Sequence, residues 1–174
     1  MKKILFIIIA ITLVPFLLLV GAFVIRTRVF WWYVASGEGM QPTLTTGERV
    51  GVHKYVRNFS NGDIIVFRHQ RNIESNDDMI IFQYPRIEIF ISRIIASGGQ
   101  TINIDFDSGN VYVDGVLLEE DYILEEELRF KGDIDFPVRV LEGSFFVMGD
   151  NRNNSRDSRQ IGVVHKSQIV GRVS

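Results

Sequence analysis

The hydrophobic pattern divides this chain into two unlike parts. From Ile4 to Ile25 the residues are almost all Ile, Leu, Val, Phe and Ala, and none of them is charged. After residue 33, short runs rich in β-branched and aromatic residues recur between turn signals such as Asn61-Gly62 and Asp114-Gly115. The pattern predicts one long apolar helix followed by a domain of many short strands.

The apolar run is long enough to cross a membrane. At about 1.5 Å per residue, a helix from Ile4 to Ile25 spans roughly 33 Å, against a hydrocarbon core of about 30 Å. The alternative is a cleaved secretory signal peptide, whose apolar core is usually about 7–15 residues and ends at a small-residue cleavage site. Here Arg26 and Arg28 follow the run instead. We therefore predict an uncleaved transmembrane anchor with a short cytoplasmic N-terminus over residues 1–28, and an extracytoplasmic domain over residues 29–174.

Charge supports this division but fixes the orientation only weakly. Residues 1–28 hold four of the 19 Lys and Arg residues and no acid, which leaves 15 basic residues against 21 acidic ones in the remainder. Lys2 and Lys3 favour a cytoplasmic N-terminus, although Arg26 and Arg28 nearly balance them. The aromatic cluster Phe30–Tyr33 suits the lipid headgroup layer, with an ordinary core position as the alternative.

The pattern in the second part of the chain predicts an all-β domain. Close spacing of short strands suggests antiparallel sheets folded into a barrel-like domain. A helical turn is expected only within Glu119–Arg129, and a solvated loop or hairpin tip over His69–Asp78. The predicted strands are Arg49–Tyr55, Asp63–Phe67, Ile80–Tyr84, Ile89–Ala96, Thr101–Phe106, Asn110–Val113, Phe136–Leu141, Ser144–Met148 and Ile169–Val173.

Composition excludes several classes of protein. With 46% hydrophobic and 23% charged residues and a net charge of −2, the chain is neither disordered nor a bulk-basic nucleic-acid binder. The absence of cysteine excludes disulfides, a thiol nucleophile and thiolate metal sites. His53, His69 and His165 lack the spacing of metal ligands, so we expect no metal and no cofactor.

Two segments concentrate chemically capable residues. Ser36–Leu44 is a glycine-punctuated turn that enters a proline-containing stretch, and Gly149–Arg159 packs charges, amides and hydroxyls into one loop after an apolar strand. From composition alone, the second segment reads most simply as a hydrogen-bonded turn cluster.

These segments, taken in their order along the chain, resemble the sequence motifs of a known family. Met40-Gln41-Pro42-Thr43-Leu44 is similar to the S-M-x-P-T-L nucleophile box of the type I signal peptidases, and Gly149–Arg159 matches their last box almost letter for letter. Between them, matching boxes occur in order at Gly62–Phe67, Arg93–Ile95 and Val111–Gly115. The resemblance implies a membrane-anchored serine peptidase fold that processes the signal peptides of exported proteins.

The departures from the family pattern fall on its catalytic pair. The family nucleophile is the serine before the Met, where this chain has Gly39, and the general base is the lysine before the Arg, where it has Ser92. The segment after Arg93 also differs from the family motif, since residues 96–100 are Ala-Ser-Gly-Gly-Gln in place of G-L-P-G-D. Both members of the dyad are therefore substituted.

Other family positions are retained. By resemblance, Ser155 would orient the missing lysine, Asp157 and Arg159 would form an ion pair that braces the loop, and Gly37 with the Gly39 amide would lie at the oxyanion hole. The retained motif positions are Met40, Pro42, Ser155, Asp157 and Arg159.

Nearby residues are poor replacements for the dyad. Ser36 lies three residues before Gly39, a displacement of about 10 Å along an extended chain, whereas reacting atoms approach to about 3 Å. Thr43 falls on the family's own Thr, and Glu38 lacks the second carboxyl that an acid protease needs. Since peptide hydrolysis by this route needs a nucleophile and a base, we predict a catalytically inactive homologue, most similar to the inactive paralogue found beside an active enzyme in some Gram-positive bacteria.

The predicted setting follows from the anchor and the family. We expect a single-pass protein of the cell membrane that contacts lipid, and that binds signal peptides of exported proteins or an active signal peptidase paralogue, with no role for nucleic acid. The alternative is an active membrane serine endopeptidase that cleaves signal peptides through non-standard residues.

Overall fold

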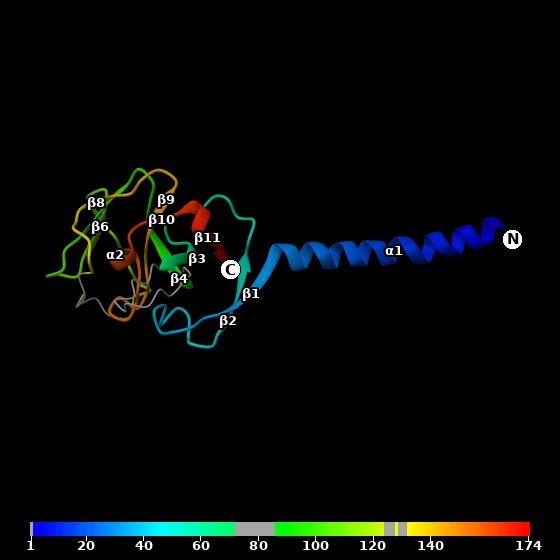
Figure 1. Ribbon diagram of the computed structural model, residues 1–174, viewed down its shortest axis with the longest axis horizontal. Coiled ribbons are helices and arrows are strands. Elements are labelled where there is room, and N and C mark those ends of the chain that lie inside the picture. The colour runs from blue at the N-terminus through cyan, green and yellow to red at the C-terminus, as the bar shows by residue number, and fades with distance from the viewer. Residues whose placement is uncertain (1, 72–85, 124–127, 129–131) are drawn as a thin grey trace, which may run out of the picture.

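The computed structural model describes residues 2–71, 86–123, 128 and 132–174. Its first element is a long helix, α1 (Lys2–Val29), which projects from the rest of the molecule as a single arm with the N-terminus at its far end (Figure 1). Among the described residues, no helix combines the length and the apolar character needed to cross a membrane.

The larger sheet has seven strands, all paired antiparallel. Their spatial order is β1-β2-β11-β3-β4-β9-β10. The bounds in chain order are β1 (Phe30–Val34), β2 (Arg49–His53), β3 (Ile64–Arg71), β4 (Arg86–Ser97), β9 (Ser144–Met148), β10 (Val164–His165) and β11 (Ile169–Val173).

The smaller sheet has four strands and lies at the end of the domain farthest from α1 (Figure 1). Its antiparallel order is β7-β6-β5-β8. The strands are β5 (Thr101–Ile104), β6 (Val111–Val113), β7 (Val116–Leu117) and β8 (Val138–Arg139). Two short helices complete the described elements, namely α2 (Ser158–Ile161) and the 3-10 helix η1 (Lys166–Gln168).

The centre of the larger sheet is buried on both faces. Consecutive strand residues point to opposite faces, yet Ile65, Val66 and Phe67 of β3 are all fully buried. Val66 belongs to a cluster with Met40 and Leu44 of the loop after β1, whereas Ile65 and Phe67 pack on the other face. A third cluster, which includes residues of β4, β5, β6 and β9, joins the two sheets. The loop that carries Met40 is therefore held by core packing.

The all-β prediction is confirmed, but the barrel-like closure is not. A closed barrel requires its first and last strands to pair, and in the described part of the chain β1 and β10 end the sheet order without pairing to each other. Strand β10 is only two residues long and pairs with β9. The strands form two open, folded sheets.

Most predicted strands are present, several with different bounds. Ser144–Met148 and Ile169–Val173 agree with β9 and β11, whereas Phe136–Leu141 contracts to the two residues of β8. The predicted strand Ile80–Tyr84 lies outside the described residues. Strand β3 continues to Arg71, so His69 is in a strand, and residues 72–78 of the predicted loop or hairpin tip lie outside the described residues.

Three of the described strands were not predicted. Strand β1 contains the aromatic cluster assigned to the headgroup layer, and it pairs with β2 in register from Phe30–His53 to Val34–Arg49. Strands β7 and β10 are each two residues long, too short to show an alternating pattern. The helical turn predicted in Glu119–Arg129 is absent over residues 119–123, which form a loop with one turn.

Candidate functional site

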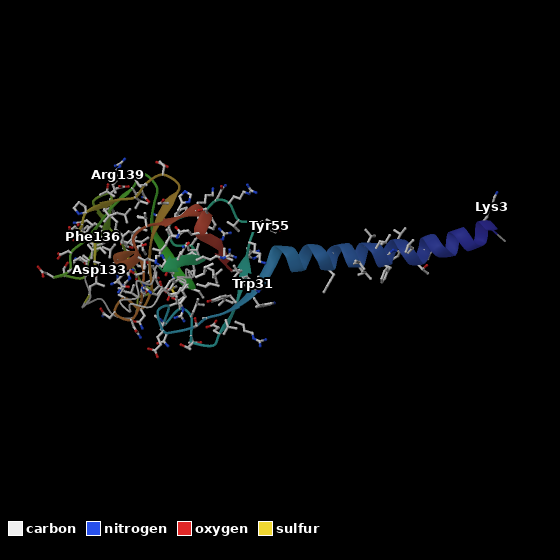
Figure 2. The ribbon with its side chains drawn as sticks, in the orientation of Figure 1. Lys3, Trp31, Tyr55, Asp133, Phe136 and Arg139 are labelled. Carbon is white, nitrogen blue, oxygen red and sulfur yellow. The ribbon has the colours of Figure 1, made fainter. Side chains whose placement is uncertain are left out.

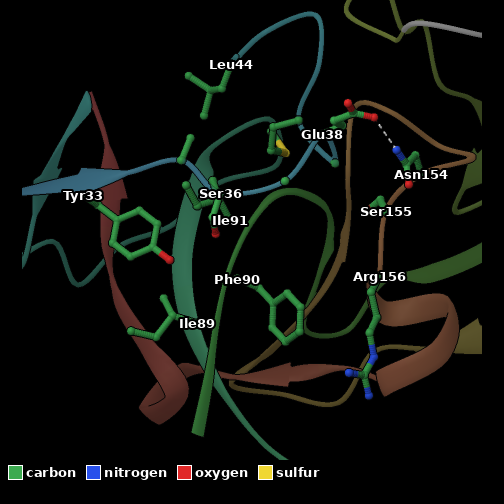
Figure 3. Close-up of a pocket in the computed structure, with 14 residues that line it drawn as sticks. Tyr33, Ser36, Glu38, Leu44, Ile89, Phe90, Ile91, Asn154, Ser155 and Arg156 are labelled. Carbon is green, nitrogen blue, oxygen red and sulfur yellow. Dashed lines mark hydrogen bonds between the residues drawn. The ribbon is translucent and has the colours of Figure 1, made fainter. Parts of the chain in front are cut away.

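A cavity of about 270 Å³ lies beside Gly39. Its walls come from β1 and the loop after it, from the middle of β4, and from the loop between β9 and α2 (Figure 3). These segments are far apart in the sequence and are brought together by the pairing of β1 with β2 and of β3 with β4. The lining residues are Tyr33, Ala35, Ser36, Gly37, Glu38, Gly39, Met40, Leu44, Ile89, Phe90, Ile91, Asn154, Ser155 and Arg156.

Backbone hydrogen bonds join the two ends of the loop that follows β1. The Ala35 amide donates to the Glu48 carbonyl and the Gly47 amide donates to the Ala35 carbonyl, both at 2.8 Å. Gly37 has φ +80°, a left-handed conformation that favours glycine, and its carbonyl accepts a 2.7 Å bond from Thr46 Oγ1. The chain therefore turns sharply just before Gly39.

Gly39, the family nucleophile position, lies directly against the loop between β9 and α2. Its carbonyl accepts a 3.0 Å bond from the Asn151 amide. A Cβ at position 39 would lie 3.5 Å from the Cβ of Ser155 and 3.5 Å from the Asn154 carbonyl oxygen, which are ordinary van der Waals distances. The structure thus brings Gly39 and Ser155 together and leaves room for a side chain at position 39.

Ser92, the family general-base position, is enclosed in the protein. It lies in β4 opposite Ile65 of β3 and is 1% exposed. Its Oγ donates a 2.8 Å bond to the Ile91 carbonyl. Although Ile89, Phe90 and Ile91 line the cavity, Ser92 is not among the described residues that do so.

The Asp157–Arg159 ion pair is present and fully buried. Arg159 Nε donates to Asp157 Oδ1 at 2.9 Å, and Nη2 donates to Oδ2 at 2.8 Å. Asp157 also caps α2 and accepts a 3.0 Å bond from the Gly149 amide, while Arg159 Nη2 donates to the Arg152 carbonyl at 2.6 Å. Since both charges are buried, removal of either partner would leave an uncompensated charge in the loop.

A second buried pair ties the end of β9 to β4. Arg93 Nε donates to Asp150 Oδ1 at 2.8 Å and Nη2 contacts Oδ2 at 2.5 Å, and Thr43 Oγ1 also donates to this carboxylate. Burial lowers the pKa of the Arg93 guanidinium, but the hydrogen bond and charge of Asp150 outweigh this effect and the pKa is raised. Thr43 is therefore part of the hydrogen-bonded cluster around Asp150.

Sequence reasoning missed the continuation of this cluster. The Arg93 guanidinium lies 3.9 Å from the centre of the Tyr122 ring, and the Tyr122 hydroxyl donates to Glu120, which pairs in turn with Arg152. Burial and the neighbouring Glu120 carboxylate raise the pKa of Tyr122 well above its usual range. The alternation pattern could not reveal these contacts because residues 119–123 form an irregular loop.

Two charged side chains, Glu38 and Arg156, are among the described residues that line the cavity. Arg156 forms a 2.8 Å ion pair with Glu88 and lies over the Phe90 ring, while Glu38 accepts a 2.8 Å bond from Asn154 Nδ2 (Figure 3). Ser36 and Glu38, the weak replacements for the dyad, both line this cavity. Among its described lining residues there is no lysine and no histidine.

The three histidines lie apart from the cavity lining. His69 in β3 packs near the Phe90 ring, and burial together with the Arg156 charge lowers its pKa, partly offset by Glu88. His165 caps η1 and accepts from the Ser167 amide, and His53 is the last residue of β2. No group of three metal-ligating side chains occurs within the residues that the structure describes.

A family model described as "Signal peptidase, peptidase S26" matches residues 5–174. The chain belongs to the signal peptidase family.

Individual relatives are similar over most of the chain. Signal peptidase I P of Bacillus subtilis subsp. natto is 34% identical over 88% of this chain and 80% of its own length. Signal peptidase I S of Bacillus subtilis strain 168 is 37% identical over 86% of this chain and 78% of its own. A crystal structure of a signal peptidase I from Enterococcus faecalis V583 is 25% identical and covers 69% of this chain and all of that one, with a TM-score of 0.49.

Proposed function

We propose that this signal peptidase homologue has no peptidase activity of its own and binds extended peptides in the cavity beside Gly39. Signal peptides of exported proteins are the expected ligands, and an active signal peptidase paralogue is the expected protein partner. The observation that carries the proposal is the position of Gly39, which lies where the family has its serine and offers no side chain to the cavity.

Chemistry supports the loss of activity. Acyl transfer at a peptide bond needs an oxygen nucleophile and a positioned base that accepts its proton. Ser155 has a hydroxyl beside Gly39, but no lysine or histidine is found among the described residues of the lining. Glu38, the lining carboxylate, is hydrogen-bonded to Asn154, and an acid mechanism requires a second cooperating carboxyl.

The scaffold around the substituted positions supports retained binding. The two buried ion pairs, Asp157–Arg159 and Arg93–Asp150, keep the loop and β4 in place without any contribution from the dyad. On the side of β4 away from β3, pairing with β9 begins at Arg93, and none of the described strands pairs with residues 89–92 there. A free strand edge can pair with an extended peptide.

We also propose that α1 is a single-pass anchor in the cell membrane, with the N-terminus cytoplasmic and the β domain extracytoplasmic. The uncharged run from Ile4 to Ile25, which extends beyond the side chains that the structure describes, supports this, as do the large apolar side chains that α1 exposes between Ile11 and Phe23. Trp31, whose ring lies 4.8 Å from Lys54 Nζ, is 41% exposed near the junction of α1 with the domain (Figure 2). Amphipathic aromatic side chains of this kind suit the membrane interface.

The test is cleavage of a preprotein by the full chain in detergent at high protein concentration. The native chain should give no cleavage, and the double variant Gly39→Ser plus Ser92→Lys should cleave at the normal site. The single variants are the matched controls and should stay inactive, because each lacks one member of the dyad. Circular dichroism of each variant establishes that it is folded at the assay temperature.

Cleavage by the native chain at the proper site would overturn the proposal and favour the non-standard peptidase. In another outcome, the double variant folds but does not cleave the preprotein, and the native chain binds no peptide. That result would show that the groove does not retain peptide binding.

A further inference from the structure

An ion pair joins the loop between β9 and α2 to strand β4 beside the cavity. Arg156 Nη1 lies 2.8 Å from Glu88 Oε2, and the Arg156 guanidinium also lies over the Phe90 ring, with 5.8 Å between Cζ and the ring centre. Arg156 and Phe90 both line the cavity, as do Asn154 and Ser155 of the same loop (Figure 3). A change that released Arg156 would therefore loosen one wall of the cavity.

A histidine lies next to this ion pair. His69 of β3 is directly opposite Glu88 of β4 in the antiparallel register, so the two side chains are on the same face of the sheet. The centre of the His69 ring is 6.3 Å from that of Phe90, the ring on which Arg156 lies. These four side chains therefore form one cluster that joins β3, β4 and the loop.

Several charged or titratable side chains occur on the described elements around His69. They are Arg68 on β3, Arg86 and Glu88 on β4, Arg156 on the loop, and His165 and Lys166 at η1. Arg68 is the neighbour of His69 in the strand and so points to the opposite face, and η1 contacts β3 through a 3.3 Å bond from Gln168 Nε2 to the Arg68 carbonyl. Burial lowers the pKa of His69, Arg156 lowers it further and Glu88 raises it. The charges that act on the imidazole are thus the two members of the ion pair.

Protonation of His69 and formation of the ion pair oppose each other. Arg156 disfavours the imidazolium by like-charge repulsion, and by reciprocity a proton on His69 disfavours the position of Arg156 by the same free energy. The imidazolium also offers Glu88 an alternative partner. The ion pair is only partly buried, since 38% of the Arg156 side chain and 22% of the Glu88 side chain are exposed, so it is weak enough for one neighbouring charge to compete with it.

We propose that His69 is a proton-operated switch for the Arg156–Glu88 ion pair. In neutral solution the imidazole is uncharged, and the ion pair ties the loop to β4. In mildly acidic solution the imidazolium attracts Glu88 and repels Arg156, so the guanidinium leaves the carboxylate and the loop opens more often. The switch concerns the motion of the cavity wall, and it operates whether or not the cavity binds a peptide.

The test follows the imidazole and the loop in the full chain in detergent. NMR titration gives the protonation midpoint of His69, whose resonance is identified by its loss in His69→Gln. Hydrogen exchange of the backbone amides of residues 153–156 is measured from pH 4.5 to pH 7.5 and divided by the rate in His69→Gln at the same pH. This ratio cancels the chemical pH dependence of exchange and the protonation of carboxylates. It should be about 1 well above the His69 midpoint and about 3 well below it, the size of change expected for a partly exposed ion pair.

Two further variants separate the switch from a general effect of acid. Glu88→Gln removes the acceptor of the ion pair, so the same ratio, measured between Glu88→Gln and the double variant Glu88→Gln plus His69→Gln, should stay at about 1. His165→Gln replaces an exposed histidine that caps η1 and should leave the switch in place.

A ratio that stays constant through the titration of His69, or a change that persists in Glu88→Gln, would overturn the proposal. If His69→Gln does not fold, the native chain alone decides the question. The Arg156 Nε resonance should then shift with the His69 midpoint, and a shift with a different midpoint would overturn the switch. None of these measurements uses a peptide, so their outcome is independent of the proposed peptide-binding function.

Discussion

Gly39 and Ser155 are neighbours across the cavity wall, with 3.5 Å between the Ser155 Cβ and the place a Cβ would take on Gly39. Gly149 also lies against Ser155, but a Cβ there would be 2.2 Å from Ser155 Oγ and 2.4 Å from the Gly39 carbonyl oxygen. The two glycines thus contact the same serine and differ in the space they have.

This difference predicts opposite effects of the same substitution. Gly39→Ala should keep stability or raise it by up to about 1 kcal/mol, since alanine restricts the unfolded chain. Gly149→Ala should cost about 2 kcal/mol, because the added methyl group overpacks a rigid site. Urea unfolding of both variants measures the two free energies, and equal losses would show that Gly39 is also tightly enclosed.

Ser92→Lys in the otherwise native chain should lower the melting temperature at pH 7. Position 92 is 1% exposed, and a buried ammonium without a partner is unfavourable. Because the lysine pKa would be lowered by folding, the loss should shrink as the pH rises toward the unfolded value of about 10.4.

Ser92→Met is the matched control for this variant. Its side chain is of similar length but uncharged, so any loss it causes should not depend on pH. A Ser92→Lys melting temperature at pH 7 equal to or above that of the native chain would refute the idea that the serine relieves a buried charge.

Asp150→Asn should destabilise the domain by about 3 kcal/mol, because it leaves the Arg93 guanidinium without its counter-charge at a largely buried position. Glu88→Gln breaks the more exposed Arg156 pair and should cost less than about 1 kcal/mol. Chemical unfolding of both variants measures the two free energies of unfolding and shows which loss is larger. Similar losses of stability would mean that the difference in burial between the two ion pairs does not determine how strongly each one stabilises the domain.

The His69 pKa should respond in opposite directions to two neighbouring substitutions. Burial and then Arg156 lower it, and Glu88 raises it. Arg156→Gln should therefore increase the pKa and Glu88→Gln should decrease it, as followed by NMR titration of the imidazole resonances. A shift in the same direction for both variants would contradict this arrangement of charges.

The same shift sets a pH dependence of stability. Because folding lowers the His69 pKa, the folded state binds this proton less well than the unfolded state does. The native chain should therefore lose stability as the pH falls below about 6.5. His69→Gln should remove that part of the acid sensitivity, which thermal unfolding at pH 7.5 and pH 5.5 measures. An unchanged pH dependence in His69→Gln would contradict the assignment.

The hydrophobic pattern predicted correctly those strands whose sequence is a clear apolar run bounded by turn or polar residues. Ser144–Met148 is an apolar run between a glycine turn and a polar loop, so its bounds as β9 could be read directly. Phe30–Val34 was harder, because an aromatic run beside an apolar helix suits a membrane interface as well as a strand. Its pairing with β2 shows that the run is a strand, and that pairing depends on residues 15 to 23 positions away in the chain.

The sequence by itself determined the all-β class, the family, and the identity of the residues at the two catalytic positions, Gly39 and Ser92. These follow from periodicity and from ordered motifs, which need no contact to be read. Only the tertiary structure decided which side chains surround Gly39, that Ser92 is enclosed, and that Arg93 is held between Asp150 and Tyr122. The physical reason is that these contacts join segments far apart in the chain, and strand register with core packing selects them after the local elements have formed.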